Sequence, residues 1–381
     1  MNQGFYLSLM IGGIVPDPAP KVLIDALTKA QITTTAGQRS GFQLTFQAGK
    51  NSPILQDLLP SGFFDPPSRV ILVLTMNGRP TTLMDGVITR HEFTASNEPG
   101  QSTLTLTGVD VSQMMDLIDL SGFPWWAMSA EVQVLAILAR YAMYGIIPKI
   151  IPSPLLYVPN PLEKLPTQRG TDYAHIRKLA DDTGYVFYVE PGDVPGTNYA
   201  YWGPEIKFGE VQPALSVNMD AATNVESLSF SFDGLGKTVF ILFVEEPISK
   251  VAIPIPIPDI TPLNPPLGIR PPIPLSVTFL NRPQELEDDT SKYEIVQAAA
   301  RGLSRASQAS DVISASGTLD VLRYGGILKA RSLVGVRGAG KNYDGEYFVK
   351  SVTHNIKRGE YKQSFTLSRN AFSPMTSTVS P

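Results

Sequence analysis

Two glycine-rich segments have a spacing that could bind phosphate. In GVRGAGKN (residues 335–342) the outer glycines and the lysine fit a phosphate-binding loop, but Asn342 replaces the Ser or Thr that would bind magnesium. The next residues favour a strand, whereas such a loop leads into a helix N-terminus. In DGLGKT (233–238) the first glycine position holds Ser231. We therefore predict that 335–342 is a tight turn and that neither segment binds phosphate.

Other catalytic patterns are also missing. His91, His175 and His354 lie far apart in the sequence, and we interpret His175 as a surface residue on the polar side of a helix. There is no cysteine and no G-x-S-x-G segment. Acidic pairs such as Asp181-Asp182 are sequence neighbours, so their side chains point in different directions and cannot flank a substrate. The sequence predicts no enzyme, no metal site and no cofactor.

Trp125 and Trp126 stand side by side in GFPWWAM (122–128), where a β-rich region ends. Adjacent large aromatic residues in a connecting segment either fill a core or anchor an interface. The sequence leaves both interpretations open, so Trp125 and Trp126 are the candidate interface residues.

The charge is modest but uneven. The 381 residues have a formal net charge of −4, which indicates no general attraction to nucleic acid. Residues 320–370 hold ten Lys or Arg against four acids, a local excess of six positive charges. Such a region is either a solvated face or one half of a complementary subunit contact. The N-terminus lacks a basic signal region and no segment is a good membrane span, so we expect no direct membrane insertion.

Local signals predict a mainly β chain with two helices near its middle. Asn77-Gly78 and Asp85-Gly86 are typical of turns between strands, and STLTLTGV alternates as a strand does. A helix is expected from Ser129 to Tyr144, and a second one from a Thr171 cap to a Gly184 stop. The expected apolar stripes are Val132, Leu135, Ala139, Ala142 and Met143 on the first helix, and Tyr173, Ile176, Leu179 and Ala180 on the second.

A proline-rich segment interrupts the second β-rich region. Residues 247–274 contain ten prolines, which favours an extended strap lying on a protein surface rather than a packed element. Ser291 and Glu294 form a capping box that predicts a helix to about Ala309.

Two segments share one layout. Residues 85–109 and 344–370 each have Asp-Gly, a strand with Thr and His near its end, a polar turn and an alternating strand. They are either generic hairpins or an internal duplication, with two related β-barrels in one chain.

Two segments resemble a known family. TDYAHIRKLADDTGYVFYVE (171–190) and DGEYFVKSVTHNIKRGEYKQSFTLSRNAF (344–372) are similar to the helix–strand unit and the closing strands of phage baseplate hub proteins, the late control protein D family. The resemblance covers about residues 1–372, and His175 departs from it where members often have a large apolar residue.

The resemblance implies an α+β, mainly β fold with two tail-tube-like β-barrels. It implies a first barrel in 1–120 and a second in 211–246 plus 311–372. An inserted α/β domain would occupy 121–210, a Pro-rich strap plus helix insertion 247–310, and a polar tail 373–381.

The implied function is that of a structural baseplate hub in a phage tail or contractile injection system. A homotrimer would join a three-fold spike to the six-fold inner tube, with rings formed through strand pairing and barrel contacts. Expected partners are a separate trimeric spike protein, inner tube proteins and other baseplate components, with no specific nucleic acid. The particle would assemble in the cytoplasm. The alternatives are a β-rich carbohydrate-binding adhesin and a cell-wall hydrolase.

Overall fold

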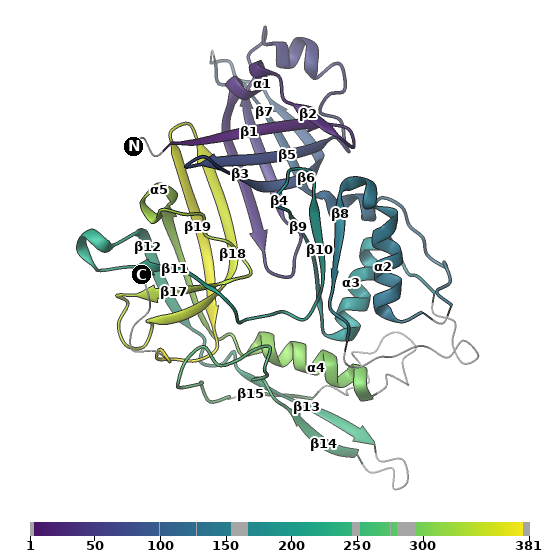
Figure 1. Ribbon diagram of the computed structural model, residues 1–381, viewed down its shortest axis with the longest axis vertical. Helices are drawn as coiled ribbons and strands as arrows, with labels where there is room; N and C mark the ends of the chain where they lie inside the picture. The colour runs from purple at the N-terminus through teal and green to yellow at the C-terminus, as the bar shows by residue number, and fades with distance from the viewer. Residues whose placement is uncertain are drawn as a thin grey trace.

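The computed structural model describes residues 4–98, 100–126, 128–153, 167–245, 252–274, 276–279 and 295–375. Strands dominate, and the predicted α+β, mainly β class is confirmed. A 13-stranded sheet forms the body of the molecule, and two three-stranded sheets accompany it. Figure 1 shows the smaller domain with α2 and α3 beside the sheet, and α4 with the third sheet at one end.

The first part of the large sheet, here the N-terminal β unit, is built from strands close in sequence. A short π-helix, Ile54–Leu58, follows its fourth strand, and the 3₁₀ helix Val111–Asp116 follows its last. Its other elements are β1 (Phe5–Gly12), β2 (Pro16–Pro18), α1 (Lys21–Ala26), β3 (Leu27–Thr35), β4 (Gly41–Gln47), β5 (Arg69–Met76), β6 (Arg79–Thr94) and β7 (Thr103–Asp110).

The second part, the C-terminal β unit, is interrupted in sequence by an insertion. A 3₁₀ turn at Asp220–Ala222 precedes its second strand. Its other elements are β11 (Val211–Ser216), β12 (Val225–Phe232), β16 (Ile313–Asp320), α5 (Val321–Tyr324), β17 (Leu333–Arg337), β18 (Gly345–Lys357) and β19 (Glu360–Arg369).

The two units repeat one strand order. The N-terminal β unit reads β3-β4-β7-β6-β5-β1, and the C-terminal β unit reads β12-β16-β19-β18-β17-β11. When the six strands of each unit are ranked by their order along the chain, the two sheets show the same series of ranks. One difference is that β1 pairs with β5 antiparallel, whereas β11 pairs with β17 in parallel. This repetition favours the internal duplication over the alternative of two generic hairpins.

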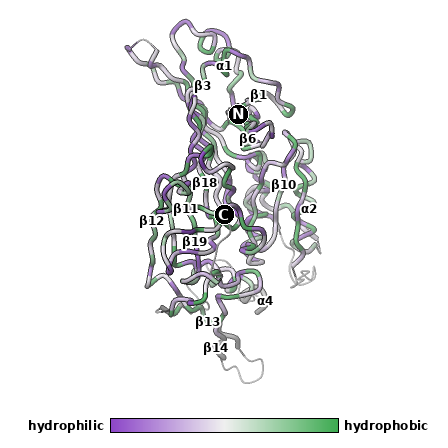
Figure 2. Tube along the Cα trace, turned by 60° about the vertical axis from the view of Figure 1, so that its left-hand side comes forward, coloured by the Kyte–Doolittle hydropathy of each residue, from purple (hydrophilic) through white to green (hydrophobic). Residues whose placement is uncertain are grey.

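The units share one core. The predicted alternation is confirmed, since Leu104 and Leu106 in β7 and Phe365 and Leu367 in β19 are all buried. These four belong to one hydrophobic cluster that extends through both units. Hydrophobic and hydrophilic residues are interspersed along the strands, as Figure 2 shows, because successive side chains point to opposite faces.

The predicted turn at Asp85-Gly86 is wrong. Strand β6 runs through both residues without a break. A Cβ on Gly86 would lie 2.3 Å from the carbonyl oxygen of Val109, so glycine here permits close approach of β7 rather than a turn. Asp344-Gly345, in contrast, stands at the start of β18, so the two Asp-Gly pairs are not equivalent positions.

The smaller domain follows the N-terminal β unit. The Thr171 cap and the Gly184 stop are confirmed, because the Thr171 hydroxyl accepts a hydrogen bond from the Ala174 N–H and Gly184 adopts φ +72°. Its sheet has the order β8-β10-β9. Its elements are α2 (Ala130–Arg140), a 3₁₀ turn (Ala142–Tyr144), β8 (Ile146–Ile150), α3 (Asp172–Thr183), β9 (Val186–Pro191) and β10 (Asn198–Gly203).

The apolar stripe predicted for α2 is wrong. Val134, Ile137 and Leu138 are buried, whereas Val132 and Leu135 are about half exposed. The helix has apolar residues on both faces, so its periodicity did not identify the face that packs.

The proline-rich strap is partly a strand. Residues 252–257 form β14 at the edge of a sheet ordered β14-β13-β15, and an edge strand tolerates prolines because its outer N–H groups need no partner. Further along, Leu267 packs against the C-terminal β unit as a strap would. Ser291 and Glu294 lie outside the described residues. This insertion contains β13 (Thr238–Glu245), β14 (Ala252–Ile257), β15 (Ser276–Phe279) and α4 (Ile295–Ala309).

Strand β13 differs from the sequence-based assignment. Residues 238–245 were expected in the second barrel but pair with β14 and β15 instead. The alternation typical of a strand does not reveal which sheet the strand joins.

A buried ion pair fastens the smaller domain to the N-terminal β unit. Arg69 and Asp85 are both buried, and Arg69 donates from Nε to Oδ1 at 2.8 Å and from Nη2 to Oδ2 at 2.6 Å. The same guanidinium donates to the carbonyls of Tyr144 and Gly196, which belong to the smaller domain. Asn198 Nδ2 also donates to Asp85 Oδ2 at 2.8 Å. The pair thus fixes the orientation of that domain.

Asp85→Asn should destabilise the protein by about 3–5 kcal/mol, because it leaves the buried guanidinium of Arg69 without its counter-charge. Urea unfolding followed by circular dichroism measures the change. Glu92→Gln is the matched control, since it breaks the exposed Arg90–Glu92 pair at a similar N–O distance of 2.6 Å. Equal effects of the two substitutions would contradict the proposed role of the buried pair.

Candidate functional site

The two candidate tryptophans have different environments. Trp125 is 2% exposed, donates from Nε1 to Gln168 Oε1 at 3.3 Å and stacks on the His175 ring. It fills the core of the smaller domain. Trp126 is 60% exposed and is therefore the one of the two that remains available at the surface.

The interpretation of His175 as a surface residue is wrong. It is buried between Trp125 and Gln133, whose Oε1 lies 2.9 Å from Nε2. Burial lowers the pKa of His175 to about 4, so the ring is neutral at pH 7. The sequence did carry a signal, because His175 lies one helical turn before Leu179 of the predicted apolar stripe and next to Ile176. The family that the chain resembles also often has a large apolar residue at this position.

The other histidines do not join it. His354 lies in the C-terminal β unit, where burial also lowers its pKa to about 4 and Nδ1 contacts the Tyr361 hydroxyl at 2.6 Å. His91 lies 3.5 Å from Asp65 in the N-terminal β unit. Among the described residues no group of three or more His, Cys, Asp or Glu could hold a metal ion.

The glycine-rich segment at 335–342 is a turn. Gly335 belongs to β17, and the chain then turns at Gly338 (φ +86°) into β18 without forming a helix. The Ala339 N–H donates to Asp344 Oδ1 at 2.8 Å, so a side chain of the same turn takes this donor. The predicted tight turn is confirmed.

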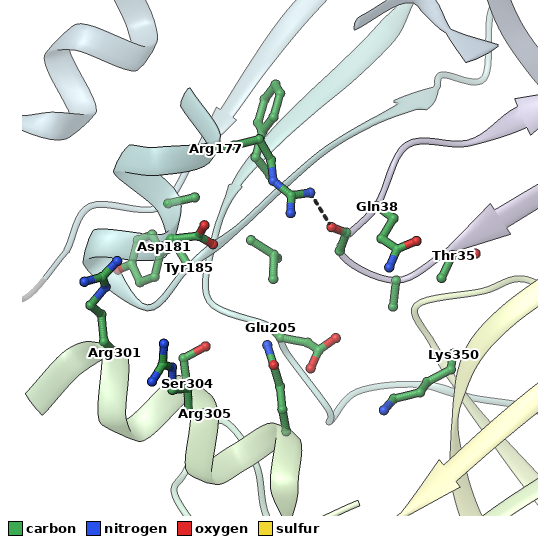
Figure 3. Close-up of a pocket in the computed structure, with 16 residues that line it drawn as sticks. Thr35, Gln38, Arg177, Asp181, Tyr185, Glu205, Arg301, Ser304, Arg305 and Lys350 are labelled. Carbon is green, nitrogen blue, oxygen red and sulfur yellow. Dashed lines mark hydrogen bonds between the residues drawn. The ribbon is translucent and has the colours of Figure 1, made fainter. Parts of the chain in front are cut away.

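A charged cleft of about 530 Å³ lies where α3, α4 and the turn after β3 meet. Arg177 from α3 donates to the Gly37 carbonyl at 2.8 Å, as the dashed line in Figure 3 shows. Arg301 and Arg305 of α4 and Lys350 of β18 line the same cleft. Arg301 pairs with Asp182 of α3 at 3.3 Å. The lining contains no histidine or cysteine, and its ion pairs connect parts of the chain.

The basic region at 320–370 is partly internal. Arg369 is fully buried and donates to the carbonyls of Leu267 and Asp344. Arg331 donates to the Thr35 carbonyl of the N-terminal β unit and lies 3.6 Å from Glu190. Arg331 and Arg369 therefore hold segments of this chain together.

Among the strand edges that lack a second partner in the described residues, two are candidate contact surfaces. Within the part of the chain that the structure describes, β12 pairs only with β16, and residues 90–94 of β6 pair only with β7. Phe93 and Phe232 on these edges are 42% and 43% exposed. An unpaired edge presents N–H and C=O groups to any further strand, so both edges can accept one. The sequence pattern identified the strands but not their free edges.

No helix in the described ranges is long and apolar enough to cross a membrane.

No protein-family model matches the chain, and no curated protein matches it. Solved structures do share its fold. The prophage MuSo2 43 kDa tail protein from Shewanella oneidensis matches with TM-score 0.59 and 14% identity, over 96% of this chain and 98% of that chain. The tail protein from Neisseria meningitidis MC58 matches with TM-score 0.58 and 12% identity, over 96% and 97%. A chain of the half-lidded Francisella PdpA–VgrG complex matches with TM-score 0.55 and 9% identity, over 100% and 60%. The chain therefore has the fold of these tail proteins.

Trp125→Ala should destabilise the protein by about 3–5 kcal/mol, because it leaves a large cavity beside His175. Trp126→Ala should change the stability by no more than about 0.5 kcal/mol, because that side chain is exposed. Urea unfolding, monitored by circular dichroism, measures the free energy of unfolding of both variants. A large loss with Trp126→Ala in the isolated chain would contradict its placement at the surface.

Acid should destabilise the fold through the buried histidines. The pKa of His354 is about 4 in the folded chain and about 6.5 when unfolded, so below pH 6.5 the unfolded state binds the proton more readily. The stability that neutral His354 provides is complete above pH 6.5 and is lost as the pH falls toward 4.

Urea midpoints measured from pH 7.5 to 4 test this expectation. His354→Asn should flatten the decline, because it removes the titrating ring. The wild-type chain, measured in parallel, gives the reference slope. An unchanged slope in His354→Asn would show that other groups cause the acid sensitivity.

Proposed function

We propose that this chain is a structural baseplate hub of the late control protein D type, in a phage tail or a contractile injection system. In this proposal three copies form a ring that joins a three-fold spike to the six-fold inner tube. The ring is a symmetry adaptor, since each chain contributes two similar units and three chains contribute six.

The observation that supports this proposal most is the repeated strand order within one chain. Two units with the order β3-β4-β7-β6-β5-β1 and its C-terminal equivalent give each copy two comparable faces. The likeness to two tail proteins over nearly their whole length supports a place in a tail.

We extend the proposal to the domain plan. The tube-like barrels would comprise about 1–120 and 211–246 plus 311–372, without the β13 residues 238–245, which belong to the small third sheet. The α/β domain at 121–210 and the insertion at 247–310 would lie outside the tube.

The proposed partners are a separate trimeric spike protein, inner tube proteins and other baseplate components. A chain of a VgrG complex shares the fold, which supports a position next to a spike. Exposed Trp126 is the residue we assign to a contact with a neighbouring component. The particle would assemble in the cytoplasm and could be released.

The proposed role is not enzymatic. Trp125 stacks on His175, whose ring contacts Gln133 in the core of the smaller domain. The buried carboxylate of Asp172 accepts hydrogen bonds from Arg140, Tyr141 and Gln168, so this polar cluster is also satisfied within the chain. The cleft between α3 and α4 is lined by ion pairs that join segments of the chain.

A tagged copy expressed in its native source tests the proposal. High-speed pelleting and quantitative mass spectrometry should recover the chain with tube and sheath proteins at about three copies per particle. Light scattering of the purified chain should give a mass three times that of one copy.

A tagged cytosolic protein of similar size is the control for adventitious pelleting. If particles pellet without this chain while it stays in the supernatant as a monomer, the hub proposal is wrong. Assays for glycan binding and cell-wall hydrolysis would then follow.

A further inference from the structure

The contact that joins the two units shows how strands of this chain pair across units. Residues 351–357 of β18 pair antiparallel with residues 35–29 of β3. The Thr353 and Thr33 hydroxyls lie 3.0 Å apart across this contact, and the Ala36 N–H donates to the Lys350 carbonyl at 2.7 Å. A strand of the C-terminal β unit thus covers the open edge of the N-terminal β unit.

Strand irregularities establish which residues of the two units are equivalent. In β6 the register with β7 shifts between Ile88 and Arg90, and in β18 the register with β19 shifts between Val349 and Ser351. Just before the shift, the Ile88 N–H donates to the Ser68 carbonyl at 2.8 Å and the Val349 N–H donates to Ser332 at 2.9 Å. Ile88 is therefore the equivalent of Val349, and Arg90 of Ser351.

The receiving strands match in the same way. In β3 the register with β4 shifts between Leu27 and Lys29, and in β12 the register with β16 shifts between Val225 and Ser227. Lys29 thus corresponds to Ser227 and Thr33 to Ser231. β-Bulges are specific local features, so their recurrence at matching places fixes the alignment of the two units residue by residue.

With this alignment, the unpaired edges of β6 and β12 correspond to the two strands of the β18–β3 contact. Residues 90–94 of β6 correspond to the part of β18 that pairs with β3, yet they have no second partner among the described residues. Strand β12 corresponds to β3, and its outer edge is likewise unpaired there. Within the described ranges, each chain therefore keeps one unpaired edge that corresponds to β18, at residues 90–94 of β6, and one that corresponds to β3, along β12.

We propose that residues 90–94 of β6 pair antiparallel with residues 229–233, the end of β12 and the residue that follows it, in a second copy of this chain. This inference rests on the proposed ring and specifies its contact. Transferring the β18–β3 register gives the pairs Arg90–Asp233, His91–Phe232, Glu92–Ser231, Phe93–Phe230 and Thr94–Ser229.

The side chains suit this register. Phe93 and Phe230 take the places of His354 and Ile32, which are both buried in the intrachain contact. Pairing would therefore bury the 42% exposed ring of Phe93 against another aromatic ring. At the outer face Arg90 comes opposite Asp233, a pair of opposite charges.

A second copy is the occupant that the structure favours. The edge of β6 fits β12 because the chain already pairs the equivalent strands within itself, and the two edges belong to different surfaces. Such a contact is head-to-tail, so it closes into a ring when the rotation between copies permits.

Disulfide formation tests the register, and the absence of native cysteine makes the background clean. In Glu92→Cys/Ser231→Cys the new thiols replace the equivalents of Thr353 and Thr33, whose side chains touch. Mild oxidation should link copies into a covalent closed trimer on a non-reducing gel. An intrachain link is ruled out by the six strands that lie between β12 and β6 in the sheet.

Glu92→Cys/Ser227→Cys is the matched control. Ser227 lies on the same strand and face, but four residues away, about 13 Å along the strand. Disulfides need Cα atoms within about 7 Å, so this variant should remain unlinked. Linking of the control and not of the first variant would overturn the register.

Hydrogen exchange on the wild-type chain gives an independent measurement. Peptides covering 90–94 and 229–233 should both gain protection when the ring forms at high concentration. A trimer without this protection and without the disulfide would overturn the strand contact while the hub proposal stands. Protection of β6 only after addition of tube protein would assign the edge to the tube instead. A chain that is monomeric and absent from particles would overturn the hub itself.

Discussion

The pairing of β18 with β3 is the interaction on which the rest of the structure depends. It joins two units of identical strand order into one sheet and makes their apolar faces one continuous core. Without it the outer edge of β3 would be open, and an open edge invites uncontrolled association. The bulge after Val349 makes the pairing possible, because it lets one strand leave β17 and continue along β3.

Around this sheet, charged groups act together with apolar contacts in attaching the other parts. The Arg69–Asp85 pair bonds to carbonyls of the smaller domain, and Arg331 of the C-terminal β unit reaches both Thr35 and Glu190. Arg39 after β3 bonds to Asp116 at 3.0 Å and lies over the Tyr173 ring. Directional contacts of this kind fix orientation as well as proximity. The smaller domain is thereby held at one angle to the sheet.

Local chemistry determined what the sequence could predict. The Thr171 cap, the Gly184 stop and the alternation in β7 and β19 depend on neighbouring residues, and all were predicted correctly. The burial of His175, the role of Gly86 and the sheet that β13 joins depend on segments distant in sequence. Resemblance to a family indicated the fold, which no single motif did. The free edges of β6 and β12 became visible only when the strand order was known.

Placing both units in one polypeptide also affects how an assembly can grow. The β18–β3 contact forms at an effective concentration set by the connecting chain, so it does not depend on how many copies are present. Any closed ring built from such chains has half as many contacts between separate chains as one built from single units, so it also needs fewer encounters. Fewer encounters mean fewer incomplete rings in which subunits can become trapped. The covalent link also fixes the alternation of the two kinds of unit, so errors in their order around a ring cannot arise.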